Sequence, residues 1–172
     1  LHTGWGSWER MRGGDAEGRF AKAIAALDRS LELNPANAMA WYRRGGAYMN
    51  WGSATMERGQ DPGERFGKAE ADFGRALELN PRYLDALMWR GGLRSNWGAW
   101  IMGVGGDPEP LYAGASADYA RAGELNPRSG ELHRLRSGVL ANLGVHRMDR
   151  DQDPTEVFEQ AIAALAEAMR LN

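Results

Sequence analysis

Apolar side chains recur at the spacing of an α-helix in two neighbouring segments of this chain. The first segment carries one such series: Met39, Trp41, Tyr48 and Trp51. The second carries another: Ala69, Phe73, Ala76 and Leu77. Two helices, joined by a short polar connection, are therefore predicted between residues 35 and 80.

Residues typical of helix ends bracket both segments. Asp61 followed by Pro62 is typical of a helix start, because Asp caps free N–H groups and proline lacks the N–H that the first turn does not use. Glu64, three residues after Asp61, completes a capping-box pattern. Asn80 precedes a proline, which disfavours the helical conformation and ends the second helix. The predicted helices span about 37–58 and 62–79.

The same pattern returns every 46 residues. The string Leu-Asn-Pro at 33–35 recurs at 79–81 and 125–127. The Asp-Pro pair also recurs at this offset, and so does an aromatic residue, as Phe66, Tyr112 and Phe158. We interpret residues 1–172 as a single array, and we expect it to be a segment of a longer protein. Its predicted parts are a partial repeat, 1–34, and three repeats, 35–80, 81–126 and 127–172.

These marks resemble the tetratricopeptide-repeat family over essentially the whole chain. The first helix carries the resemblance in Ala40-Trp41-Tyr42-Arg43-Arg44-Gly45. The second carries it in Ala69, Phe73, Ala76 and the closing Leu-Glu-Leu-Asn-Pro at 77–81. The resemblance implies an all-α, right-handed solenoid of helical hairpins.

One departure from the family is the length of the repeat. The family repeats every 34 residues, so each unit of this chain has 12 extra residues. Either a loop was inserted or both helices grew. We favour lengthened helices, because Ser53-Ala54-Thr55-Met56-Glu57-Arg58 is compatible with a helix and Gly59-Gln60 is the one clear break. This interpretation places Gly52 inside a helix.

In the family, the first helix of each unit lines a concave groove that binds partners. The resemblance therefore implies partner-binding positions at Tyr42, Gly46, Met49, Asn50, Met88, Gly92, Asn96, Arg134 and Asn142. Asn50, Asn96 and Asn142 recur without a capping role, although asparagine is disfavoured within helices. Two interpretations stay open. The amides hold an extended peptide backbone over a bare glycine floor, or each Asn bonds to the helix end of the next unit.

An arginine also recurs once per unit, as Arg44, Arg90 and Arg136. These residues could form a basic ladder for an acidic peptide. We favour a structural role, bridging neighbouring units or capping carbonyl groups, because each arginine lies beside a small residue expected in the core.

Composition narrows the function. The 21 basic and 23 acidic residues give a net charge of −2, which argues against nucleic-acid binding. The absence of cysteine fits a cytoplasmic protein, and no apolar run reaches the roughly 20 residues that span a bilayer. The series Asp149, Asp151 and Asp153 starts like a calcium loop, but Pro154 and Gln160 stand where that loop needs Gly and Glu.

The expected function is a non-enzymatic, bacterial protein-interaction scaffold that binds a peptide or partner protein. No catalytic group, cofactor, metal, nucleic acid or membrane is expected. Two alternatives remain open at this point. One is a self-assembling solenoid that stacks through its ends. The other is a regulatory segment of a larger signalling enzyme, such as a bacterial serine/threonine kinase.

Overall fold

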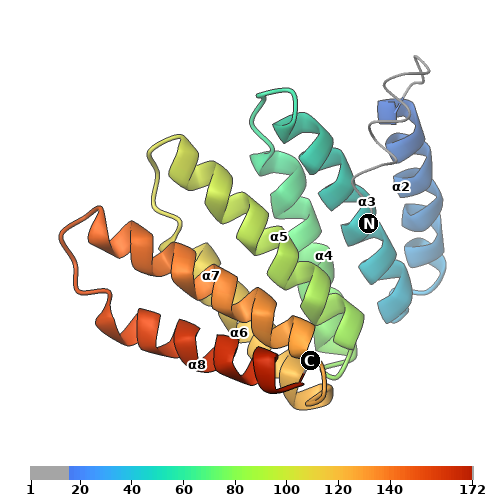
Figure 1. Cartoon of the computed structure of the whole chain (residues 1–172). Helices are drawn as coiled ribbons and strands as arrows, with labels where there is room; N and C mark the ends of the chain where they lie inside the picture. Colours follow the sequence, from blue (N-terminus) through green and yellow to red (C-terminus); the bar gives the residue numbers. More distant parts are fainter. Residues whose placement is uncertain (1–15, 172) are drawn as a thin grey trace. The chain divides into compact units, whose positions relative to one another are not determined.

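The computed structural model describes residues 16–171, which form seven α-helices and no strand (Figure 1). The helices are α2 (Ala16–Leu33), α3 (Ala38–Met56), α4 (Gly63–Leu79), α5 (Leu84–Gly103), α6 (Glu109–Leu125), α7 (Gly130–Met148) and α8 (Thr155–Leu171). The prediction of an all-α helical repeat is confirmed. The start of the predicted partial repeat, residues 1–15, lies outside the described residues.

The chain divides into two compact units, Leu1–Asn80 and Pro81–Asn172. Their boundary falls where one predicted repeat meets the next. In the first unit, α3 packs against both α2 and α4. In the second unit, α5 packs on α6, α6 on α7 and α7 on α8. Each unit is thus built from successive helices that pair along their length (Figure 1).

Lengthened helices, and not an inserted loop, accommodate the extra residues of each unit. Residues 53–56 continue α3, and α4 begins at Gly63 after a short connection. The predicted span 37–58 is correct to within two residues at each end, and 62–79 to within one. The first helices of successive hairpins, α3, α5 and α7, begin 46 residues apart.

The predicted capping box at the second helix is wrong. The carboxylate of Asp61 does accept a backbone N–H, that of Gly63, at 2.8 Å, and Asp107 and Asp153 do the same at their helices. Glu64, however, accepts a hydrogen bond from Lys68 at 2.8 Å and does not reach back to the cap. The ammonium one turn ahead is the stronger competitor for this exposed carboxylate.

Aromatic rings explain the glycines within the long helices. A Cβ added to Gly52 would lie 2.5 Å from the ring of Phe66, and one added to Gly98 would lie 2.8 Å from the ring of Tyr112. Both rings are fully buried. Two helices can approach this closely only where one of them has no side chain, so the glycines allow the rings to fill the core.

The first two recurring arginines have the expected structural role, although the pair that Arg90 forms lies within its own repeat, whereas Arg44 also contacts the preceding repeat. Arg44 donates to both carboxylate oxygens of Asp72, at 2.8 and 2.6 Å, and also to Asp28 of α2 at 2.6 Å. Hydrogen bonding to Asp72 raises the pKa of Arg44 above its usual value. Arg90 holds Asp118 of α6 in the same two-point manner, at 2.9 and 2.6 Å. These pairs bind α3 to α4 and α5 to α6.

Candidate functional site

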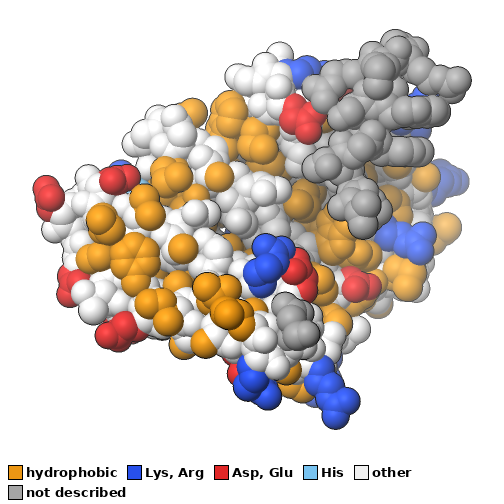
Figure 2. Space-filling view, viewed as in Figure 1, with side chains coloured by type: hydrophobic (Ala, Val, Ile, Leu, Met, Phe, Trp, Pro, Cys, Tyr) orange, Lys and Arg blue, Asp and Glu red, His pale blue; other side chains and the backbone are white. Residues whose placement is uncertain are grey.

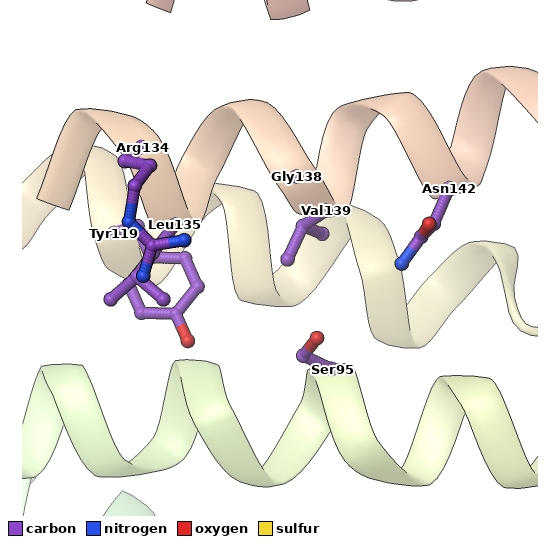
Figure 3. A pocket seen from close by; sticks show the side chains of 7 residues that line it. All are labelled: Ser95, Tyr119, Arg134, Leu135, Gly138, Val139 and Asn142. Carbon is purple, nitrogen blue, oxygen red and sulfur yellow. The ribbon is translucent and has the colours of Figure 1, made fainter. Parts of the chain in front are cut away.

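A groove of about 250 Å³ lies between α5 and α7, with α6 beneath it (Figure 3). Its lining comes from all three helices: Ser95, Tyr119, Arg134, Leu135, Gly138, Val139 and Asn142. The whole site belongs to the second compact unit.

The floor of the groove is apolar and bare at its centre. Val139 and Tyr119 are buried. A Cβ added to Gly138 would meet no atom within 4 Å, so the backbone of α7 borders open space here. A ligand can therefore approach the helix more closely than a side chain would permit.

Asn142 stands at the rim of this floor, and Figure 3 shows its side chain directed towards the α5 side. Asn142 and its counterpart Asn96 on α5 are exposed. Neither side chain has a hydrogen bond to another residue within 16–171. The interpretation that each Asn bonds to the helix end of the next unit therefore finds no support at these two positions.

Arg134 brings a positive charge to the other end of the groove. Its guanidinium donates two hydrogen bonds to Glu131, at 2.7 and 2.6 Å, and both side chains are more than half exposed. Hydrogen bonding to Arg134 lowers the pKa of Glu131. An exposed pair of this kind contributes little to stability, so Arg134 can exchange Glu131 for an acidic ligand group at small cost.

Tyr119 enters the groove from α6. Its ring fits beneath Gly91, where an added Cβ would lie 2.9 Å away, and its hydroxyl points into the space between α5 and α7 (Figure 3). Burial raises the pKa of Tyr119 to about 12, and the negative charges of Asp118 and Glu131 act in the same direction. At neutral pH the phenol is therefore protonated and able to donate a hydrogen bond.

The groove brings together two of the nine positions implied by the family resemblance, Arg134 and Asn142. Met88, Gly92 and Asn96 lie on α5 outside its lining. The remaining four lie on α3 in the first unit: Tyr42, Gly46, Met49 and Asn50. All nine side chains or backbones are at least partly accessible to solvent. The three asparagines and Arg134 are exposed, and the other five are half-buried.

Sequence reasoning missed Tyr119 as a groove residue. Tyr119 recurs at the place of Phe73 and Leu165, an apolar position of the second helix that predicts packing against the first helix. A signal was present, because Tyr119 alone of these three carries a hydroxyl that needs a polar neighbour or water.

One protein-family model matches part of the chain, and several solved structures resemble its fold. The family model described as TPR repeat matches residues 16–52. The structure titled MamA MSR-1 C2 has 17% sequence identity and a TM-score of 0.53, and covers 90% of this chain and 68% of that chain. MamA RS-1 ArsTM double mutant has 17% identity and a TM-score of 0.54, with 90% and 66% covered. A further MamA mutant has 17% identity and a TM-score of 0.50, with 94% and 80% covered.

At this identity the structures show a shared fold. No curated protein matches the chain. Among the described helices, none has the length and apolar character needed to cross a membrane. The family model match at residues 16–52 and the recurrence of the same sequence pattern every 46 residues also indicate a helical repeat fold.

Proposed function

We propose that this chain, whose residues 16–52 match the TPR repeat model, is a scaffold that holds an extended segment of a partner protein in the groove between α5 and α7. The observation that carries the proposal is the exposed Asn142 amide beside the bare floor at Gly138. A carboxamide offers one acceptor and two donor hydrogens, which match the C=O and N–H of a peptide backbone.

The size and lining of the groove favour a peptide over a small-molecule ligand. Its volume, about 250 Å³, is below the roughly 300–1,000 Å³ of sites that enclose drug-sized molecules. It is large enough for one or two side chains of an extended segment. The apolar floor at Val139 would receive such a side chain, and Ser95 and Tyr119 offer polar contacts beside it.

The equivalent positions outside this groove are proposed to take part in partner binding through the same chemistry. They are Met88, Gly92 and Asn96 on α5, and Tyr42, Gly46, Met49 and Asn50 on α3. Their exposure supports this role. The proposed scaffold acts by binding alone, without a catalytic step or cofactor, and we propose a cytoplasmic location from the cysteine-free composition.

Blocking the groove is expected to abolish peptide binding without loss of the fold. The experiment selects binders from a displayed random-peptide library on the whole chain and measures their Kd by calorimetry. Gly138→Phe should abolish binding because the ring would occupy the floor. Asn142→Ala should weaken binding about tenfold through the loss of backbone hydrogen bonds. The thermal midpoint of both variants should stay close to that of the unchanged protein.

The matched control is Gly74→Phe, the same substitution at a glycine of α4 that also has no neighbouring atom within 4 Å of an added Cβ. It should leave binding unchanged. Selected peptides that bind equally well to Gly138→Phe would overturn the groove assignment. A loss of stability in Asn142→Ala with unaltered binding would remove the proposed role of the amide.

The exposed face of α8 favours self-association as a second candidate function. Ile162, Leu165 and Met169 are 67%, 46% and 73% exposed. Their counterparts one repeat earlier are buried in α6: Ser116, Tyr119 and Gly123. Figure 2 also shows hydrophobic side chains gathered over α7 and α8. A contiguous apolar surface of this kind is typical of an interaction face.

We expect light scattering to show a molar mass that rises with protein concentration if α8 mediates self-association. Ile162→Lys should then keep the protein monomeric, since a buried unpaired ammonium is unfavourable. Ala163→Lys is the control, because this exposed alanine follows Ile162 but points about 100° away around the helix. A constant monomer mass up to high concentration would exclude this candidate.

A further inference from the structure

Arg136 differs from the two arginines that precede it in the repeat series. Arg44 and Arg90 each hold a carboxylate 28 residues later, at Asp72 and Asp118. The residue 28 positions after Arg136 is Ala164. The α7–α8 hairpin therefore has no acidic group where the α3–α4 and α5–α6 hairpins have one.

The three hairpins share one register, so Ala164 occupies the place of the aspartates. In each hairpin the second helix begins 25 residues after the first, at 38 and 63, 84 and 109, and 130 and 155. The Gly144 backbone also lies over the ring of Phe158, as Gly52 lies over Phe66.

The second acidic partner of Arg44 also has no counterpart beside Arg136. Arg44 also pairs with Asp28 of the preceding helix, and Ala120 is the counterpart of Asp28 beside Arg136. What Arg136 does contact is the hydroxyl of Ser116, to which its Nε donates at 3.3 Å. Within residues 16–171, no carboxylate forms an ion pair with Arg136.

A pocket of about 330 Å³ lies beside this arginine, between α6 and α8 with α7 beneath. Ser116, Ala120 and Arg136 line it, together with two further alanines of α6, Ala113 and Ala117. The small side chains leave room where Arg44 has an acidic neighbour. This pocket and the α5–α7 groove share no lining residue.

Other charges in the pocket do not satisfy Arg136. Arg147 pairs with Glu109, and Glu156 accepts a hydrogen bond from Gln160 at 3.2 Å. Arg147 lies 11 residues further along α7, which corresponds to about 16 Å of helix. Arg136 is thus a half-buried cation whose contact in this pocket is the hydroxyl of Ser116.

We propose that this pocket binds the carboxylate of an Asp or Glu side chain presented by a partner protein. The guanidinium of Arg136 supplies the fork of N–H donors that a carboxylate accepts at two points, as Arg44 does for Asp72 and Arg90 does for Asp118. Ser116 adds a hydroxyl donor beside it. The site is independent of the α5–α7 groove and constitutes a second contact surface.

The test follows the Arg136 Nε–H signal by NMR while the whole protein is titrated with short peptides. The first peptide is acetyl-Ala-Ala-Glu-Ala-Ala-amide, which carries a single side-chain carboxylate. The second replaces Glu by Gln, and the third has only alanines and a free C-terminal carboxylate. We expect the Arg136 signal to shift with the Glu peptide, and to shift roughly tenfold less at equal concentration with the Gln peptide.

Three variants complete the test. Ala164→Asp restores the internal carboxylate, so it should shift the Arg136 signal without peptide and abolish the response to the Glu peptide. Arg128→Gln, an exposed arginine outside the pocket, should respond like the unchanged protein. Gly138→Phe should also leave the response intact, which separates this site from the groove.

Equal shifts with the Glu and Gln peptides, or an undiminished response in Ala164→Asp, would overturn the proposal. A response only to the free C-terminal carboxylate would overturn the assignment to an acidic side chain. Because Ala164→Asp copies a pair that two other hairpins already contain, we expect it to fold, and circular dichroism checks this.

Discussion

Replacing Asp118 by Ala is expected to lower the free energy of unfolding by about 3–5 kcal/mol, the cost of breaking a buried ion pair from one side. Asp118 is 1% exposed. It accepts two hydrogen bonds from Arg90 and a third from Arg94, at 2.8 Å. Its loss would remove the carboxylate that two largely buried guanidinium groups share. Urea unfolding followed by circular dichroism measures the change.

The control for Asp118→Ala is Glu131→Ala, which removes a carboxylate that also pairs with an arginine but is 55% exposed. Water and salt already screen that pair, so a far smaller change is expected. A loss below about 1 kcal/mol for Asp118→Ala, comparable to an exposed pair, would contradict a structural role for the arginine series.

The arginine series shows what sequence periodicity can and cannot identify. Repetition beside small core residues indicated that Arg44 and Arg90 have a structural role. Their partners were not identified, because Asp72 and Asp118 lie 28 residues away on another helix. Pairing across a hairpin depends on the register of its two helices, which is known only once both helix starts are known.

The helices themselves could be predicted almost to the residue, because apolar spacing and the Asp-Pro starts are strong local signals. The capping box failed for a local reason too. The ammonium of Lys68, one turn further along the helix, donates to Glu64, and the capping-box pattern does not take such a competitor into account. Which of two neighbouring groups a side chain will bind on one helical turn can be decided only from the three-dimensional structure.

The role of the candidate site in binding stays a prediction. Of the positions that the family resemblance selected on the first helices, Arg134 and Asn142 line the groove between α5 and α7. The resemblance could not identify the residues that form the floor of the groove. Tyr119 comes from α6, a second helix of its hairpin, and its ring lies close to α5 because Gly91 has no side chain there. The shape of the groove thus depends on a glycine and an aromatic ring 28 residues apart.

Gly52→Ala is expected to destabilise the protein by roughly 1–3 kcal/mol, although alanine is the better helix former. The added methyl would lie 2.5 Å from two atoms of the Phe66 ring and 3.4 Å from Cβ of Arg65. Phe66 is fully buried, so its ring cannot move aside without displacing other core side chains. Overpacking should therefore outweigh the gain in helix propensity, and urea unfolding would show a lower midpoint.

The opposite sign is expected for Gly74→Ala in α4 of the same unit. A Cβ added there meets no atom within 4 Å, so only the helix propensity changes, and stability should rise by about 1 kcal/mol. The two variants are chemically identical and differ only in what faces the new methyl. Equal changes in stability at both positions would mean that the Phe66 ring does not require a glycine at position 52. Opposite effects would show that the mid-helix glycines allow close packing between the paired helices of this repeat.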